Sequence, residues 1–100
     1  MKLSIQKTND TMTGELSGRL DNKGLASVRY EMKVLEDNAD KHIVLDFSGL
    51  QFISLSGIRL IQSLQNATKR NGGYMSIKNV AVTVMQLITA TGFATLLNFE

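Results

Sequence analysis

The spacing of the apolar residues changes repeatedly along the 100-residue chain, and this alternation constrains the fold more than any other feature. From Met12 to Leu20, apolar or glycine residues occupy every second position, which is typical of a half-buried strand. After Asp21 the apolar residues take the spacing of one helix face, at Leu25, Val28, Met32 and Leu35. The sequence therefore predicts a strand over 12–20 and a helix over 22–37. Leu3 and Ile5 predict a shorter strand that pairs with the first of these as a hairpin.

A nearly continuous apolar run, from Ile43 to Phe47, predicts a central strand with layers above and below it. Ser48-Gly49 predicts a turn after this strand. Helical spacing returns over 57–70, and Asn71-Gly72-Gly73 ends that helix because glycine readily takes the left-handed conformation. A strand around 75–77, a helix over 81–91 and a short closing strand at 96–99 complete the pattern.

The resulting order is ββαβαβαβ, which predicts a single α/β domain over residues 1–100. A hairpin followed by alternating strands and helices predicts a mainly parallel mixed sheet, with an antiparallel edge and helices packed on it. The apolar fraction of 43% is enough for one core of this size and excludes a wholly disordered chain.

Several function classes are disfavoured by composition. The chain contains no cysteine, which excludes disulfides, thiol catalysis and zinc–cysteine sites. No run approaches the ~18 apolar residues of a membrane helix, and no signal-peptide pattern is present. The 11 basic residues are scattered among acids, whereas a nucleic-acid surface needs them focused on one face. We therefore expect a cytoplasmic protein that neither inserts into a membrane nor binds nucleic acid.

Catalytic signals are weak. His42 is the only histidine and precedes a strand, and the surroundings of Ser54 and Ser56 do not read G-x-S-x-G. Neither phosphate-loop pattern occurs. Asp21 and Asp46 could form a carboxylate pair, but no third ligand suggests a metal. We expect no enzymatic activity, no cofactor and no metal site.

The stretch Ile43–Leu50, followed by Phe52-Ile53-Ser54-Leu55-Ser56-Gly57-Ile58, resembles the core of the STAS domain family. Leu16–Asp21 looks like its second strand and following loop. Asn71-Gly72-Gly73, Asn79-Val80 and Thr91-Gly92-Phe93 are also similar, so the resemblance runs along essentially the whole chain.

The resemblance implies a non-catalytic α/β domain of the kind found in bacterial anti-sigma factor antagonists. Such proteins regulate transcription by partner switching: they bind a serine-kinase anti-sigma factor and free the sigma factor. The kinase inactivates them by phosphorylating a serine in the loop that opens the second helix, and a phosphatase restores them. The implied partners are therefore an anti-sigma factor kinase and a phosphatase.

One departure from the family pattern bears on this regulation. The family loop reads Asp-Ser-Ser/Thr-Gly with the first hydroxyl residue as phosphoacceptor, whereas here Ser54, Leu55, Ser56 and Gly57 take those positions. Leucine cannot be phosphorylated, so Ser56, or less favourably Ser54, replaces the acceptor, or the protein is not switched by phosphate. In the last case it is an adaptor subunit of a transport ATPase or a signalling complex.

We expect the partner to bind the face of the first two predicted helices together with the loop at 54–57. The candidate contact residues are Asp21, Ser54, Leu55, Ser56, Gly57, Ile58 and Arg59. Leu55 points either outward to a partner or inward to the core, and Ile58 and Arg59 could extend an outward patch.

Some of the same side chains also have structural interpretations. Ser54 or Ser56 could cap the second helix, and Asp21, which should lie close to that loop, could cap the first. Asp46 is interpreted as structural, accepting hydrogen bonds from loop N–H groups.

Overall fold

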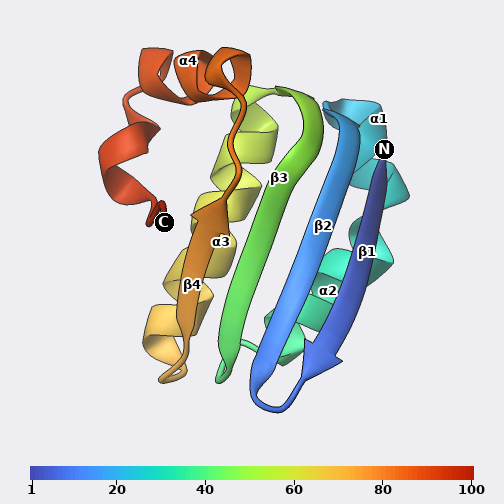
Figure 1. Cartoon of the computed structure of the whole chain (residues 1–100), viewed down its shortest axis with the longest axis vertical. Helices are drawn as coiled ribbons and strands as arrows, with labels where there is room; N and C mark the ends of the chain where they lie inside the picture. Colours follow the sequence, from blue (N-terminus) through green and yellow to red (C-terminus); the bar gives the residue numbers. More distant parts are fainter.

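The computed structural model describes all residues 1–100, with a strand hairpin and a pair of helices before strands and helices alternate (Figure 1). The elements in chain order are β1 (Lys2–Thr8), β2 (Thr11–Leu20), α1 (Asn22–Ser27), α2 (Arg29–Asp37), β3 (His42–Ile53), α3 (Leu55–Arg70), β4 (Tyr74–Lys78), α4 (Val82–Ala90) and the 3-10 helix η1 (Phe93–Leu96). None of the helices combines the length and the apolar character needed to cross a bilayer.

The four strands form one sheet in the order β1-β2-β3-β4. β1 and β2 pair antiparallel as a hairpin, whereas β2 with β3 and β3 with β4 pair parallel. The mainly parallel mixed sheet with an antiparallel edge, and hence the α/β class, is confirmed. Because β2 and β3 run in the same direction, their carboxyl ends lie side by side at one edge of the sheet.

The core lies between one face of this sheet and the helices. Helices α2 and α3 lie behind the strands in Figure 1, and no helix covers the face turned to the viewer. The core is one cluster of 20 buried residues, to which the strands contribute side chains such as Leu16, Leu45 and Ile77. The expected layers on both sides of β3 are therefore wrong. Val44, on the uncovered face, is buried between neighbouring strands by its partners Thr13 and Ser76.

The predicted helix over 22–37 is two helices. It breaks at Val28, whose φ of −111° and ψ of 14° end α1 and begin α2. At the break the carbonyl of Gly24 accepts two hydrogen bonds, from the hydroxyl of Ser27 at 2.8 Å and from the N–H of Val28 at 3.2 Å. Leu25 of α1 is half-buried against the core, and Met32 and Leu35 of α2 are buried in it, so the apolar spacing continues across the break.

Ser48-Gly49 does not form the predicted turn, because β3 continues through it to Ile53. Glu15 pairs with Asp46 and Ser17 with Gly49, so one residue of β2 faces two of β3. This is a β-bulge, in which a small flexible residue is common. A Cβ on Gly49 would lie 2.9 Å from the Cβ of Ser17, so the close approach of the two strands requires glycine here.

The predicted closing strand is largely wrong as well. Phe93–Leu96 form a 3-10 helix, and only Phe99 pairs, through a single parallel bridge to Ile77 at the free edge of β4. The helix before it, α4, ends at Ala90, close to the predicted 91, and Gly92 follows in the left-handed conformation at φ 80°.

Candidate functional site

The carboxyl ends of β2 and β3 bring two predicted site segments together. The backbone N–H of Ser54 donates to the carbonyl of Leu20 at 2.9 Å, which fixes the start of α3 beside the Asp21 loop. Gly57 permits this close approach, because a Cβ there would lie 2.9 Å from the same carbonyl oxygen. The expectation that Asp21 lies close to the loop at 54–57 is confirmed.

Ser54 is the N-cap of α3. It has extended backbone angles, and its hydroxyl accepts a hydrogen bond from the N–H of Gly57 at 3.1 Å. Ser56 lies inside the first turn, one position after Leu55, and is exposed. The two serines therefore differ in role: the hydroxyl of Ser54 is bonded within the fold, whereas that of Ser56 faces solvent.

Asp21 caps α1, as the sequence indicates. Its carboxylate accepts from the N–H of Gly24 at 2.9 Å and lies 3.7 Å from the Nε atom of Arg19. The Gly24 hydrogen bond, helped by the charge of Arg19, lowers the pKa of Asp21. The guanidinium of Arg19 also lies over the ring of Phe52, 4.3 Å from its centroid, which links the ends of β2 and β3 a second time.

The first turn of α3 presents two kinds of residue. Leu55 is 42% exposed, so its side chain points outward and not into the core, the two orientations that the sequence leaves open. Arg59 is exposed too. Gly57 and Ile58 are buried, with Ile58 only 1% exposed in the core. Their assignment to an accessible contact patch is therefore wrong, because the apolar face of the helix holds both against the sheet.

A groove of about 550 Å³ runs between α1–α2 and α3, and Ser56 lies at its lining. Apolar side chains form its inner surface: Leu25, Ala26, Met32 and Leu60. We call this feature the α2–α3 groove. The sequence predicts the partner on this face but does not reveal the groove, because the lining residues come from two separate segments of the chain, 22–36 and 56–60. The only sequence signal for the groove is the set of outward-facing positions that flank the apolar stripes of its helices.

The charged residues of the α2–α3 groove are Arg29, Lys33 and Glu36 on α2 and Arg59 on α3, all exposed. Lys33 donates to Asp37 at 3.0 Å, and this hydrogen bond raises the pKa of Lys33. The ion pairs of the chain do not involve Arg29 or Arg59. The two arginines are thus the groove's free cations.

The remaining candidates lie elsewhere. Asp46 accepts from the N–H of Ser48 at 2.9 Å and from the side-chain amide of Asn79 at 3.2 Å, which confirms its structural role. Burial opposes its ionisation, but these hydrogen bonds outweigh burial and lower the pKa of Asp46. His42 begins the twelve-residue strand that Ser54 follows, so it is not paired with Ser54 or Ser56. Its Nε2 atom instead lies 3.3 Å from the hydroxyl of Ser76.

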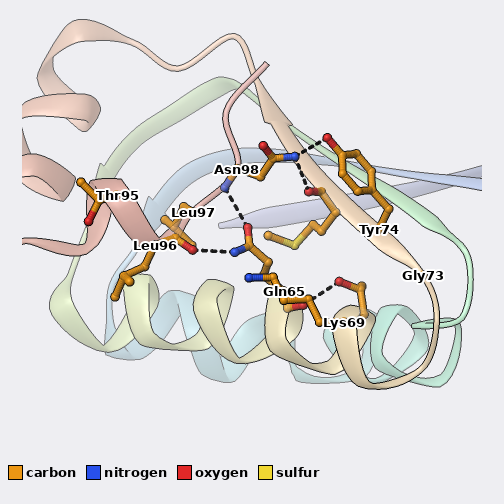
Figure 2. Close-up of a pocket in the computed structure, with 10 residues that line it drawn as sticks. Gln65, Lys69, Gly73, Tyr74, Thr95, Leu96, Leu97 and Asn98 are labelled. Carbon is orange, nitrogen blue, oxygen red and sulfur yellow. Dashed lines mark hydrogen bonds between the residues drawn. The ribbon is translucent and has the colours of Figure 1, made fainter.

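A second cavity, of about 290 Å³, lies between α3, β4 and the C-terminal segment (Figure 2). The buried amide of Gln65 bonds this segment in both directions: it donates to the carbonyl of Leu96 and accepts from the N–H of Asn98 at 2.8 Å. The side chain of Asn98 donates in turn to the carbonyl of Met75 at 3.0 Å. These bonds hold residues 96–98 over α3 and β4, and the sequence gives no signal for them.

Comparison with known proteins gives one family. The STAS domain family model matches residues 2–100. An anti-sigma F factor antagonist of Paenibacillus polymyxa is 27% identical over 93 residues, which cover 92% of this chain and 80% of the relative.

Solved structures share the fold. SpoIIAA, a Bacillus cell fate determinant and anti-sigma factor antagonist, matches in its unphosphorylated and phosphorylated forms with TM-scores of 0.76 and 0.71 and 18% identity. These alignments cover 99% of this chain and 88% and 91% of those chains. An anti-sigma factor antagonist from Mycobacterium paratuberculosis matches with a TM-score of 0.84 at 12% identity, covering 99% of this chain and 84% of that one. The match of the family model along nearly the whole sequence, on a fold shared with these structures, establishes that the chain belongs to the STAS domain family.

Proposed function

We propose that this protein is an anti-sigma factor antagonist that acts by reversible binding to a kinase-type anti-sigma factor. It has no catalytic activity of its own in this proposal. The observation that carries the proposal is the accessible first turn of α3, where Leu55 and Ser56 are exposed beside the Asp21 loop in a member of the STAS family. The likeness to a curated anti-sigma F factor antagonist supports it.

The surface at the start of α3 suits a protein partner. An outward leucine is an apolar contact that becomes favourable once a partner removes it from water. Arg19 lies over the Phe52 ring and Asp21 accepts from the N–H of Gly24, so the two side chains provide a polar margin beside Leu55. The core beneath is closed by Ile58, so the contact residues can be covered and uncovered without disturbing the fold.

Phosphorylation at Ser56 is the regulatory part of the proposal. Ser56 is favoured over Ser54 because its hydroxyl is exposed, whereas the hydroxyl of Ser54 caps the helix. Within the first turn, Gly57 and Ile58 donate to Ser54, so the N–H groups of Leu55 and Ser56 remain unbonded. A phosphate here meets the positive end of the helix dipole, so the fold tolerates it.

The phosphate would act on binding rather than on folding. It adds roughly −1.5 to −2 charges at neutral pH. A partner that covers Leu55 must either remove the phosphate from water or place its own apolar or acidic surface against the phosphate. Either arrangement weakens the complex. A phosphatase that removes the phosphate then restores binding.

One residue favours an alternative. Leu55 occupies the position of the family's usual phosphoacceptor, and an apolar side chain there suits a constitutive contact. On that alternative the protein is a STAS adaptor subunit of a transport ATPase or a signalling complex that is not switched by phosphate. Co-purification distinguishes the two, because the adaptor brings down a permease and an ATPase, and the antagonist brings down a kinase-type anti-sigma factor.

The binding proposal is tested by titrating the folded protein into purified kinase-type anti-sigma factors from the organism that encodes it. We expect one of them to form a complex with a Kd in the micromolar range or tighter. Failure of every one to bind, with circular dichroism showing a folded protein, contradicts the antagonist function.

The phosphorylation proposal is tested separately with the bound kinase, ATP and mass spectrometry. We expect one phosphate, located on Ser56 by fragmentation and absent from Ser56→Ala. An unmodified loop under conditions in which the kinase hydrolyses ATP contradicts the phosphate switch and leaves the binding proposal standing.

A further inference from the structure

The α2–α3 groove has an apolar inner surface and an uneven distribution of charge. Met32 is buried and Leu25 and Leu60 are half-buried, so the inner surface is only partly filled by the chain itself. The free cations Arg29 and Arg59 lie on its two sides. Glu36, its one acid, is seven residues beyond Arg29 on α2, which is about two helical turns away.

We propose that this groove binds an amphipathic helix of the partner whose apolar stripe is flanked by Asp or Glu side chains. The inference rests on the proposed function, because it assigns a second contact region to the same anti-sigma factor. The groove adjoins the first turn of α3 through Ser56, so one partner surface can cover both regions.

A helix fits the groove better than a strand. The walls are helices, whose backbone hydrogen bonds are satisfied internally, so an extended peptide finds no sheet edge with which to pair. A third helix instead packs its side chains between the ridges of α2 and α3. An apolar stripe along that helix would cover Leu25, Met32 and Leu60.

The charge of the flanking residues follows from the two arginines. Arg29 and Arg59 have no intramolecular ion pair, and Lys33 is already bonded to Asp37. Glutamate or aspartate side chains beside the apolar stripe would pair with the arginines, whereas a basic helix would be repelled. The end of the groove nearest Ser56 therefore selects an acidic partner.

The same arrangement connects the groove to the phosphate switch. Ser56 and Arg59 are three residues apart on α3, which places them on one face of the helix. A phosphate on Ser56 would compete with the partner's carboxylates for Arg59 and for Arg29 across the groove. Phosphorylation would thus weaken binding by occupying the cations that the acidic helix needs.

The first experiment measures the affinity of the anti-sigma factor that the wild-type protein binds. Charge reversal of both groove cations, Arg29→Glu with Arg59→Glu, should weaken binding at least about tenfold at low salt. The control is Arg70→Glu, an exposed cation at the far end of α3; it makes half the change in net charge and should change affinity less than about twofold. Thermal unfolding checks that all variants remain folded.

An unchanged affinity in the double variant, with the wild-type complex intact, overturns the groove assignment and leaves the antagonist function standing. An equal loss in Arg70→Glu also overturns it, because the effect would then reflect net charge alone.

The second experiment does not depend on the anti-sigma factor. Two synthetic 18-residue helical peptides share one leucine stripe, and one has Glu flanks whereas the other has Lys flanks. In ¹⁵N-labelled protein, the Glu peptide should shift the amide signals of Leu25, Arg29 and Leu60, and bind at least about fivefold more tightly than the Lys peptide.

Ser56→Asp should reduce the binding of the Glu peptide, and a matched change outside the groove, Ser48→Asp, should not. Equal binding of the two peptides, or shifts confined to surfaces outside the groove, overturns the proposal even if an anti-sigma factor binds the protein elsewhere.

Discussion

The different roles of Ser54 and Ser56 give a prediction whose size can be worked from the structure. Ser54→Ala removes the hydroxyl that accepts the Gly57 N–H, so the free energy of unfolding should fall by about 1 kcal/mol. For a chain of 100 residues, the unfolding entropy near the midpoint is about 0.2 kcal/mol/K, which converts this loss to a Tm decrease of about 5 °C. Ser56→Ala, at an exposed position, should change stability by less than about 0.5 kcal/mol.

Urea and thermal denaturation of the two alanine variants measure this difference directly. Ser54→Asp is the positive control, because aspartate is an equally good N-cap and favours the positive end of the helix dipole. It should retain wild-type stability. Equal losses in Ser54→Ala and Ser56→Ala, or a larger loss in the second, would refute the assignment of the cap and with it the choice of Ser56 as phosphoacceptor.

Three further predictions concern stability. Because the pKa of Asp46 is lowered in the fold, its ionised form stabilises the protein above its unfolded pKa near 4. This stabilisation is lost as the pH falls through the pKa of the folded state. Asp46→Asn should therefore flatten the acid limb of a curve of unfolding free energy against pH. Gly57→Ala should destabilise by about 1–3 kcal/mol in urea unfolding, because its Cβ would press on the Leu20 carbonyl; wild-type stability would show that the segments are not in contact. Gln65→Ala should cost about 1–3 kcal/mol and speed hydrogen exchange at the Asn98 amide, whereas unchanged exchange there would contradict the observed bond.

The apolar pattern predicts the sheet class, and the order of strands and helices up to α4 apart from one break, because both follow from residues that must face one core. It does not reveal the break at Val28, because Leu25 before the break packs against the same core that Met32 and Leu35 enter after it, and the apolar spacing stays regular. Nor does it distinguish a turn from a bulge at Ser48-Gly49, because small residues suit both and only the register with β2 decides.

The candidate site was predictable in part for similar reasons. The capping roles of Asp21 and Ser54 depend on bonds three residues away in the chain, which local pattern captures. The burial of Ile58 and the exposure of Leu55 depend on which way α3 is rotated against the sheet. The groove and the Gln65 contacts depend on the packing of distant segments, which no local pattern encodes.

The central claim is that a partner binds the accessible surface at the start of α3. Its most direct test is the Kd of the anti-sigma factor for wild type, Leu55→Ala and a matched control, Leu96→Ala. The two leucines are comparably exposed, at 42% and 49%, but Leu96 lies in η1, away from the start of α3. We expect Leu55→Ala to weaken binding at least about tenfold and Leu96→Ala to leave it unchanged. Full affinity in Leu55→Ala, or loss in Leu96→Ala alone, would contradict the claim.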